Sequence, residues 1–135
     1  MVEPINGLVI SYNYLWAREH DRREEAGRKA RPVCLQIIVA EAERGTMVAL
    51  FPITSQPPRP ERAALVIPEF EARRLGLTTP SWVIVDEWNL DDLAKSPHIA
   101  DTQPIGKMSP GFMKRVRAAA ADRIRARRYR SIPRG

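Results

Sequence analysis

The amino-acid sequence predicts a small, mainly β domain closed by a C-terminal helix, and three patterns support this fold class. Apolar and polar residues alternate through 8–16, as in a half-buried strand. Twelve prolines against seven glycines separate short apolar runs, which is typical of short strands joined by surface turns. Near the end of the chain, an apolar stripe with four-residue steps indicates an amphipathic helix: Phe112, Val116, Ala120 and Ile124. We therefore expect a small antiparallel barrel or half-barrel.

The other strands follow in order along the chain. Residues 17–31 are predicted to form a long charged loop, because they contain no helical apolar stripe. The runs 33–41 and 47–52 flank the Gly-bearing turn AERGT and predict a hairpin. Three further short strands are expected, at 64–67, 81–88 and 105–108.

Two predicted helices have recognisable ends. Pro68 precedes the short helix EFEARRL, and Gly76 follows it where a left-handed backbone is needed. Ser109 is a good N-cap for the last helix, with Pro110 in its first turn. The polar residues 89–104, which follow the predicted strand 81–88, are expected to be irregular.

Positive charge is concentrated at the C-terminal end of the chain. The 135 residues carry a formal net charge of +6. Residues 114–135 hold nine Lys or Arg and one Asp, whereas residues 1–113 hold 13 basic and 15 acidic groups. We expect a single domain, 1–135, whose basic helix and tail, 110–135, attract polyanions.

Several classes of chemistry lack their sequence patterns. The glycines are isolated, which argues against a phosphate loop or a dinucleotide fold. His20, Cys34 and His98 lack the spacing of a metal site, so no metal or other cofactor is expected. A single, buried thiol and the absence of a long apolar run favour a cytoplasmic protein that does not cross a membrane. Arginine, hydroxyl and carboxylate chemistry remains.

Five stretches of the chain are informative together, and in order they are GLVISYNYLW, RPVCLQIIVA, MVALFPITSQPP, RLGL and SWVIVDEWN. Taken together, they resemble the MazF/PemK family of toxin ribonucleases from bacterial toxin-antitoxin modules. The most specific features are the Arg31-Pro32 pair at the start of the second strand and the sequence from Pro52 to Ser55 at the end of the third.

This resemblance implies an SH3-like (CcdB/PemK-like) antiparallel barrel that forms a homodimer and inhibits growth by cleaving single-stranded RNA without a metal. In this reaction the ribose 2′-hydroxyl attacks the neighbouring phosphate, which leaves a 2′,3′-cyclic phosphate and a 5′-hydroxyl. DNA lacks that hydroxyl and is not a substrate. A cognate antitoxin peptide is implied as a second partner.

The resemblance also implies catalytic roles. Arg31, oriented by Pro32, holds the phosphate, since a preorganised guanidinium stabilises a developing phosphorane. Thr54 donates a hydrogen bond to a phosphate oxygen. Asp91 matches an acid that some family members use for proton transfer. The base that accepts the 2′-hydroxyl proton remains open among three residues, of which Glu25 is the first choice: Glu24, Glu25 and His20.

Further residues are candidates for substrate binding. Ser55 follows Thr54 directly, and Trp16 can stack on a base, as Tyr14 and Trp88 can. Asn89 stands where some family members have an arginine. Three candidates lie in the charged loop: His20, Glu24 and Arg28.

Two other functions remain open. The same barrel without catalytic activity would bind RNA or a protein partner, and the loss of the arginine at Asn89 favours this alternative. The related gyrase-poisoning toxins are a weaker match, because the tail RRYRSIPRG lacks the tryptophan-bearing end that they use.

Overall fold

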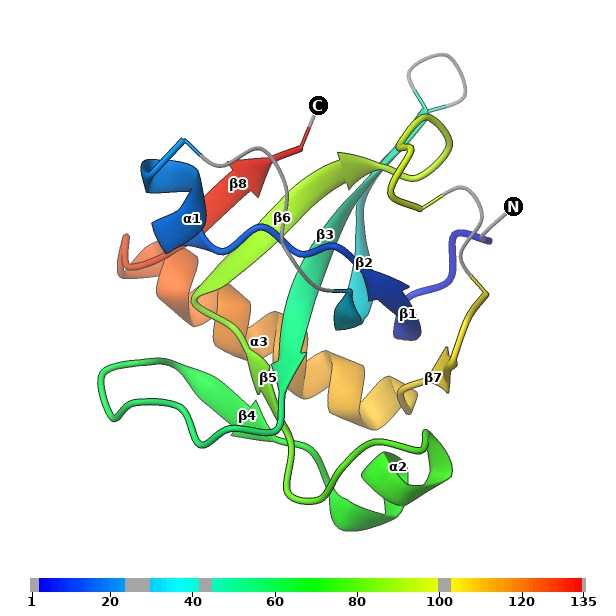
Figure 1. The fold of residues 1–135 in the computed structure, drawn as a ribbon, viewed down its shortest axis with the longest axis vertical. Coiled ribbons are helices and arrows are strands. Elements are labelled where there is room, and N and C mark those ends of the chain that lie inside the picture. Colours follow the sequence, from blue (N-terminus) through cyan, green and yellow to red (C-terminus); the bar gives the residue numbers. More distant parts are fainter. Residues whose placement is uncertain (1–2, 24–29, 42–44, 100–102, 135) are drawn as a thin grey trace.

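The structure is a computed structural model that describes residues 3–23, 30–41, 45–99 and 103–134. A mainly antiparallel β sheet forms its centre, and helix α3 crosses one face of that sheet (Figure 1). The strands run in the order β4-β5-β3-β2-β1-β7, while β6 pairs with β3 and β8. Their bounds are β1 Leu8–Tyr12, β2 Arg31–Glu41, β3 Gly45–Thr54, β4 Ala64–Val66, β5 Trp82–Ile84, β6 Glu87–Asp92, β7 Gly106–Lys107 and β8 Arg130–Pro133.

The long strand β3 organises the sheet. One of its edges pairs with β2, and the other pairs with two successive strands, first with β6 and then with β5. The predicted single strand 81–88 is therefore two strands, because the chain leaves the ladder at residues 85–86 between them. Residues 89–92, which the sequence predicts to be irregular, belong to β6.

The sheet is open. Among the described residues, β7 at one end of the strand order pairs neither with β4 at the other end nor with β8, which pairs with β6. The mainly β class with a C-terminal helix is confirmed, whereas the expected barrel does not close. Strand β8 is absent from the sequence prediction, and it runs parallel to β6.

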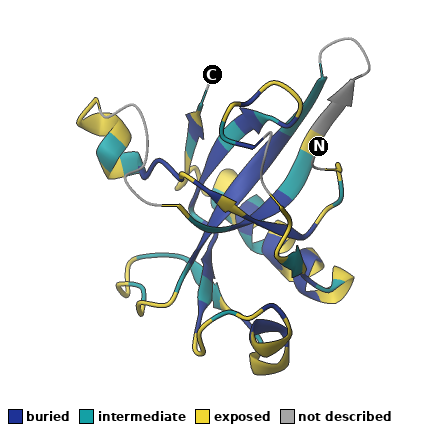
Figure 2. Ribbon diagram, turned by 45° about the vertical axis from the view of Figure 1, so that its right-hand side comes forward, coloured by how far each residue is buried: buried dark blue, intermediate teal, exposed yellow. Residues whose placement is uncertain are grey.

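Each face of the sheet has its own apolar core, because side chains alternate between the two faces along every strand. Val9, Cys34 and Phe51 pack with helix α3 on one face. Ile10 and Leu35 belong to the core on the other face. The central strands are accordingly buried along most of their length (Figure 2). Cys34 is free and fully buried, which confirms the prediction, and this burial raises the pKa of its thiol to about 12.

Helix α3, Pro110–Arg125, begins where the sequence predicts. The Ser109 hydroxyl caps it by accepting a hydrogen bond from the Phe112 N–H at 3.1 Å. Of the predicted apolar stripe, Phe112, Val116 and Ala120 are buried, but Ile124 is exposed. The stripe that docks on the sheet therefore ends one turn before the helix does.

Two short helices complete the fold. Helix α2, Glu69–Arg74, ends at Gly76 with φ +70°, which confirms the predicted left-handed stop. Helix α1, Ala17–Asp21, lies in the segment predicted to be loop. It is too short to show an apolar stripe, and it begins because the Glu19 carboxylate accepts a hydrogen bond from the Trp16 N–H at 3.0 Å.

A buried carboxylate joins α2 to α3. Glu71 is 1% exposed, and it accepts hydrogen bonds from the Ser109 N–H at 2.6 Å and the Ser109 hydroxyl at 3.0 Å. Arg74 is its ion-pair partner. Glu71→Ala leaves these donors unpaired, so we expect the free energy of unfolding to fall by about 3 kcal/mol, measured by urea denaturation.

Glu69 is the matched control, because it lies in the same helix but is exposed and pairs with the exposed Arg73. Glu69→Ala is expected to change the free energy of unfolding by less than about 1 kcal/mol. Equal losses in the two variants would mean that Glu71 does not hold the helices together.

Candidate functional site

A wide groove of about 1550 Å³ opens on one side of the molecule. Its walls include helix α1, the first residues of β2, the end of β3 with the loop that follows it, the junction of β5 and β6, and the segment between α3 and β8. These parts are far apart in the sequence, and the sheet brings them together (Figure 1). The groove therefore collects the polar residues that lie at several strand ends.

Arg31 and Thr54 both line this groove. The β2–β3 pairing ends at Val33 and Pro52, so Arg31 and Thr54 lie just beyond the last paired residues of their strands. Each is paired with another strand, Arg31 with β1 and Thr54 with β5. The structure thus places both residues in the lining of one groove, at neighbouring strand ends.

The Arg31 guanidinium is held against an aromatic ring. Its central carbon lies 4.9 Å from the centroid of the Trp16 ring, and Arg18 lies over the same ring at 5.1 Å. Burial lowers the pKa of Arg31, which means that its positive charge is poorly solvated. Its Nε is buried and has no hydrogen-bond partner among the described residues. An anion in the groove would stabilise this charge.

Thr54 ends β3 with its hydroxyl oriented. The hydroxyl oxygen accepts a hydrogen bond from the Gln56 N–H at 3.1 Å, so its own hydrogen remains free to be donated to a ligand. Ser55 is exposed and also lines the groove. Both hydroxyls therefore stand on the wall that contains the end of β3.

One cluster in the groove has no counterpart in the sequence prediction. Arg62 donates hydrogen bonds to Asp86 at 2.7 Å and to Glu87 at 2.9 Å, and the bond to Asp86 raises the pKa of Arg62. Glu87 also accepts from the Tyr14 hydroxyl and the Ala17 N–H, each at 2.9 Å. The sequence signal is the Asp-Glu pair at the break between β5 and β6. This cluster ties the β3–β4 loop and α1 to the sheet.

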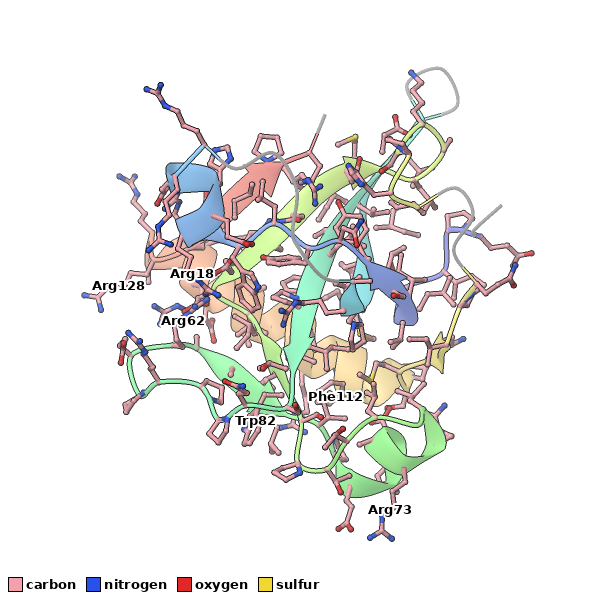
Figure 3. The ribbon with its side chains drawn as sticks, viewed as in Figure 1. Arg18, Arg62, Arg73, Trp82, Phe112 and Arg128 are labelled. Atoms are coloured by element: carbon pink, nitrogen blue, oxygen red, sulfur yellow. The ribbon has the colours of Figure 1, made fainter. Side chains whose placement is uncertain are left out.

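The groove is basic. Seven arginines and four acidic residues line it. Arg62 is paired as described, and Arg130 donates two hydrogen bonds to Asp21 at 2.7 and 3.1 Å. The other five make no ion pair with any carboxylate that the structure describes: Arg18, Arg31, Arg59, Arg127 and Arg128. Figure 3 shows Arg18, Arg62 and Arg128 gathered near α1. Such a surface suits a polyanion.

The predicted substrate contact of Asn89 is wrong. Asn89 is fully buried and does not line the groove. Its side-chain carbonyl accepts from the Leu15 N–H at 2.9 Å, and its amide donates to the Leu15 carbonyl at 2.8 Å. Its side chain is therefore used to hold the backbone of the N-terminal segment.

The predicted proton-transfer role of Asp91 is contradicted in the same way. Asp91 is 4% exposed and lies outside the groove lining. It accepts hydrogen bonds from the Tyr12 hydroxyl at 2.7 Å and the Ser96 hydroxyl at 2.6 Å. Both corrections have one reason, which is that chain segment 12–17 covers this face of β6.

The remaining candidates divide into three groups. Trp16 lines the groove, but it is mostly buried and its ring carries the two arginines. His20 is exposed on α1 and is not part of the groove lining. Three candidates lie outside the described residues: Glu24, Glu25 and Arg28.

Comparisons of the chain with models of protein families, with curated proteins and with solved structures found no match in any of the three. In the described part of the chain, none of the helices has the length and apolar character needed to span a membrane.

Asn89 provides a test of the buried polar face of β6. Asn89→Ala leaves the N–H and the carbonyl of Leu15 unpaired, so we expect the free energy of unfolding to fall by about 2–4 kcal/mol. Asn89→Arg cannot bury its charge there and is expected to be at least as destabilising. Thermal and urea unfolding measure both effects.

Asn13 is the matched control, because its side chain is exposed. Asn13→Ala is expected to change stability by less than about 0.5 kcal/mol. A stable Asn89→Arg variant would show that this face of β6 can open to the solvent.

Proposed function

We propose that this protein is a metal-independent endoribonuclease of the MazF/PemK toxin type, built on an open variant of the SH3-like barrel, which cleaves single-stranded RNA. The observation that carries the proposal is that Arg31, at the start of β2, and Thr54, at the end of β3, line the same basic groove. A groove with five arginines free of ion pairs to described carboxylates suits an extended polyphosphate chain.

The reaction uses a nucleophile that belongs to the substrate. The ribose 2′-oxygen forms a bond to the adjacent phosphorus and the bond from phosphorus to the 5′-oxygen breaks. The 2′-proton passes to a base, and the departing 5′-oxygen takes up a proton. Arg31 stabilises the additional negative charge of the phosphorane, and Thr54 donates a hydrogen bond to one of its oxygens. Pinning Arg31 against Trp16 before the substrate binds reduces the reorganisation that the step requires.

Proton transfer requires a carboxylate or an equivalent base near the ribose. Asp21, Asp86 and Glu87 line the groove, but each is paired with an arginine. Glu61 lines the groove and makes no ion pair with a described residue, so it joins Glu24 and Glu25 as a candidate base.

The same surface suits the proposed partners. An acidic antitoxin peptide would neutralise the arginines of the groove and block RNA, as complementary charge across an interface favours. A homodimer in the cytoplasm is the proposed working form of the enzyme.

A second function is a binding module without catalytic activity. It is favoured by the burial of Asn89 and Asp91, since the groove then lacks the arginine and acid that some family members supply there. In this alternative, RNA or an acidic peptide occupies the groove and is not cut.

Cleavage of a long single-stranded RNA in the presence of EDTA tests the proposal. Wild-type protein is expected to produce 5′-hydroxyl ends at defined positions. Arg31→Ala is expected to lower the cleavage rate by about 100-fold or more, because it removes the charge that faces the phosphorane. Thr54→Ala removes one donor and is expected to lower it by about tenfold or more.

Two controls make the result specific. Arg73→Ala removes an exposed arginine of α2 outside the groove, and it should leave the rate unchanged. A substrate with a single 2′-deoxy nucleotide at the cut position should resist cleavage there only. RNA that is bound but remains intact would support the binding module, and full activity of Arg31→Ala would refute the catalytic assignment.

A further inference from the structure

The segment that joins α3 to β8 forms a wall of the groove. Residues Arg127 to Arg130 all line it, together with Arg31 and Thr54. This segment is part of the predicted basic tail, yet it holds an aromatic side chain between charged ones. We call residues 127–130 the C-terminal arm.

Tyr129 provides a supported aromatic surface in the arm. Its ring is stacked on Trp88 with an angle of 5° between the planes and 5.3 Å between the centroids. Trp88 is buried and packs in turn on Phe51, at 5.4 Å. Tyr129 itself is 40% exposed. One face of the tyrosine thus rests on the core while the residue remains open to the groove, which is the arrangement of a base-stacking platform.

The backbone of the arm is fixed at both ends. At its start the Arg128 N–H donates to the Arg123 carbonyl and the Arg127 N–H donates to the Ile124 carbonyl, each at 3.0 Å. These are the two hydrogen bonds of a Schellman motif at a helix C-terminus. At its other end the Arg130 N–H donates to the Asp86 carbonyl at 2.9 Å. Tyr129 is therefore presented in a defined position.

The backbone conformation of Arg127 is unusual for its residue type. It has φ +56°, the left-handed conformation that glycine adopts without cost and that a residue with a Cβ adopts rarely. Gly76 occupies the equivalent position after α2. A positive charge thus stands where glycine is favoured, and that charge lies in the groove. This combination favours a role in binding over a role in folding.

We propose that the C-terminal arm is a nucleotide-binding subsite in which Tyr129 stacks on one base of a single strand while Arg127 and Arg128 contact its flanking phosphates. The subsite deepens the proposed ribonuclease function, on which it rests for the identity of its ligand, and it would fix the register of the strand across Arg31 and Thr54. A supported aromatic ring beside two guanidinium groups that form no ion pair with a described carboxylate suits a base with its phosphates better than an acidic peptide, which offers charge without a planar ring.

The test separates stacking from charge. The probes are a labelled 2′-O-methyl oligoribonucleotide of about ten nucleotides, which cannot react because its nucleophile is blocked, and an abasic oligomer with the same number of phosphates. Binding is measured by fluorescence anisotropy at several salt concentrations. Wild-type protein is expected to prefer the base-bearing probe. Tyr129→Ala should bind that probe about tenfold more weakly and the abasic oligomer unchanged, whereas Tyr129→Phe should keep the preference.

Phe70→Ala is the matched control for Tyr129, because Phe70 is an exposed aromatic residue of α2 outside the groove. It should bind both probes as wild type does. Thermal unfolding of Tyr129→Ala establishes that the variant remains folded at the assay temperature. Loss of binding to the abasic oligomer in that folded variant would contradict a stacking role.

Arg127→Gly tests the charge of the arm. It relieves the left-handed strain, so its melting temperature should equal or exceed that of wild type. It also removes one phosphate contact, so both probes should bind more weakly, and the slope of log affinity against log salt should fall by about 0.7. Arg73→Ala is the control outside the groove. If Arg127→Gly binds both probes as wild type does, the proposed phosphate contact of the C-terminal arm is wrong.

The two proposals fail in different ways. If RNA is cut and Tyr129→Ala behaves as wild type with both probes, the subsite is wrong and the ribonuclease stands. If RNA is never cut but Tyr129 controls preference for the base-bearing probe, the subsite stands and the catalytic proposal is wrong. The subsite is overturned if wild-type protein does not bind the base-bearing probe. It is also overturned if poly-glutamate displaces that probe equally well from wild-type protein and from Tyr129→Ala.

Discussion

The groove depends on one set of contacts, which is the attachment of chain segment 12–17 to a polar face of β6. Glu87, Asn89 and Asp91 alternate along this strand, and they bind the Ala17 N–H, the backbone of Leu15 and the Tyr12 hydroxyl respectively. All three are buried, so any one left without its partner would carry the full cost of an unsatisfied polar group. Because the partners are chiefly backbone groups, these contacts determine where the segment lies more than which side chains it bears.

The position of the Arg31 side chain follows from this attachment. Trp16 lies between Leu15 and Ala17, both of which are bound to β6, and its ring contacts the Arg31 guanidinium. An arginine at the start of a strand would otherwise sample many rotamers, and ordering it when a ligand binds would cost entropy. Here the cost of ordering is met during folding. The burial that lowers the pKa of Arg31 also strengthens the electrostatic attraction between its guanidinium and an anion, since there is less water to screen the charge.

Local signals allowed prediction of the features that depend on neighbours in sequence. Ser109 with Pro110, and Gly76 after α2, mark helix ends through their own backbone preferences, and both predictions are confirmed. The placement of Arg31 and Thr54 at adjacent strand ends follows from a hairpin of consecutive strands. Asn89 and Asp91 were misplaced because the alternation in EWNLDD has the pattern of a strand with one face in water, and only the tertiary fold covers that face with residues 12–17. Strand β8 was missed for the same reason, since its parallel pairing with β6 is a long-range contact that a short arginine-rich segment does not reveal.

Strand β6 supports the proposed site from both of its faces. Its polar face positions Trp16 and thereby Arg31, while Trp88 on the opposite face carries Tyr129 of the C-terminal arm. Residues of two parts of the groove lining are therefore attached to a single six-residue strand. Strand β6 thus connects Arg31, on which the proposed catalysis depends, with Tyr129, on which the proposed subsite depends.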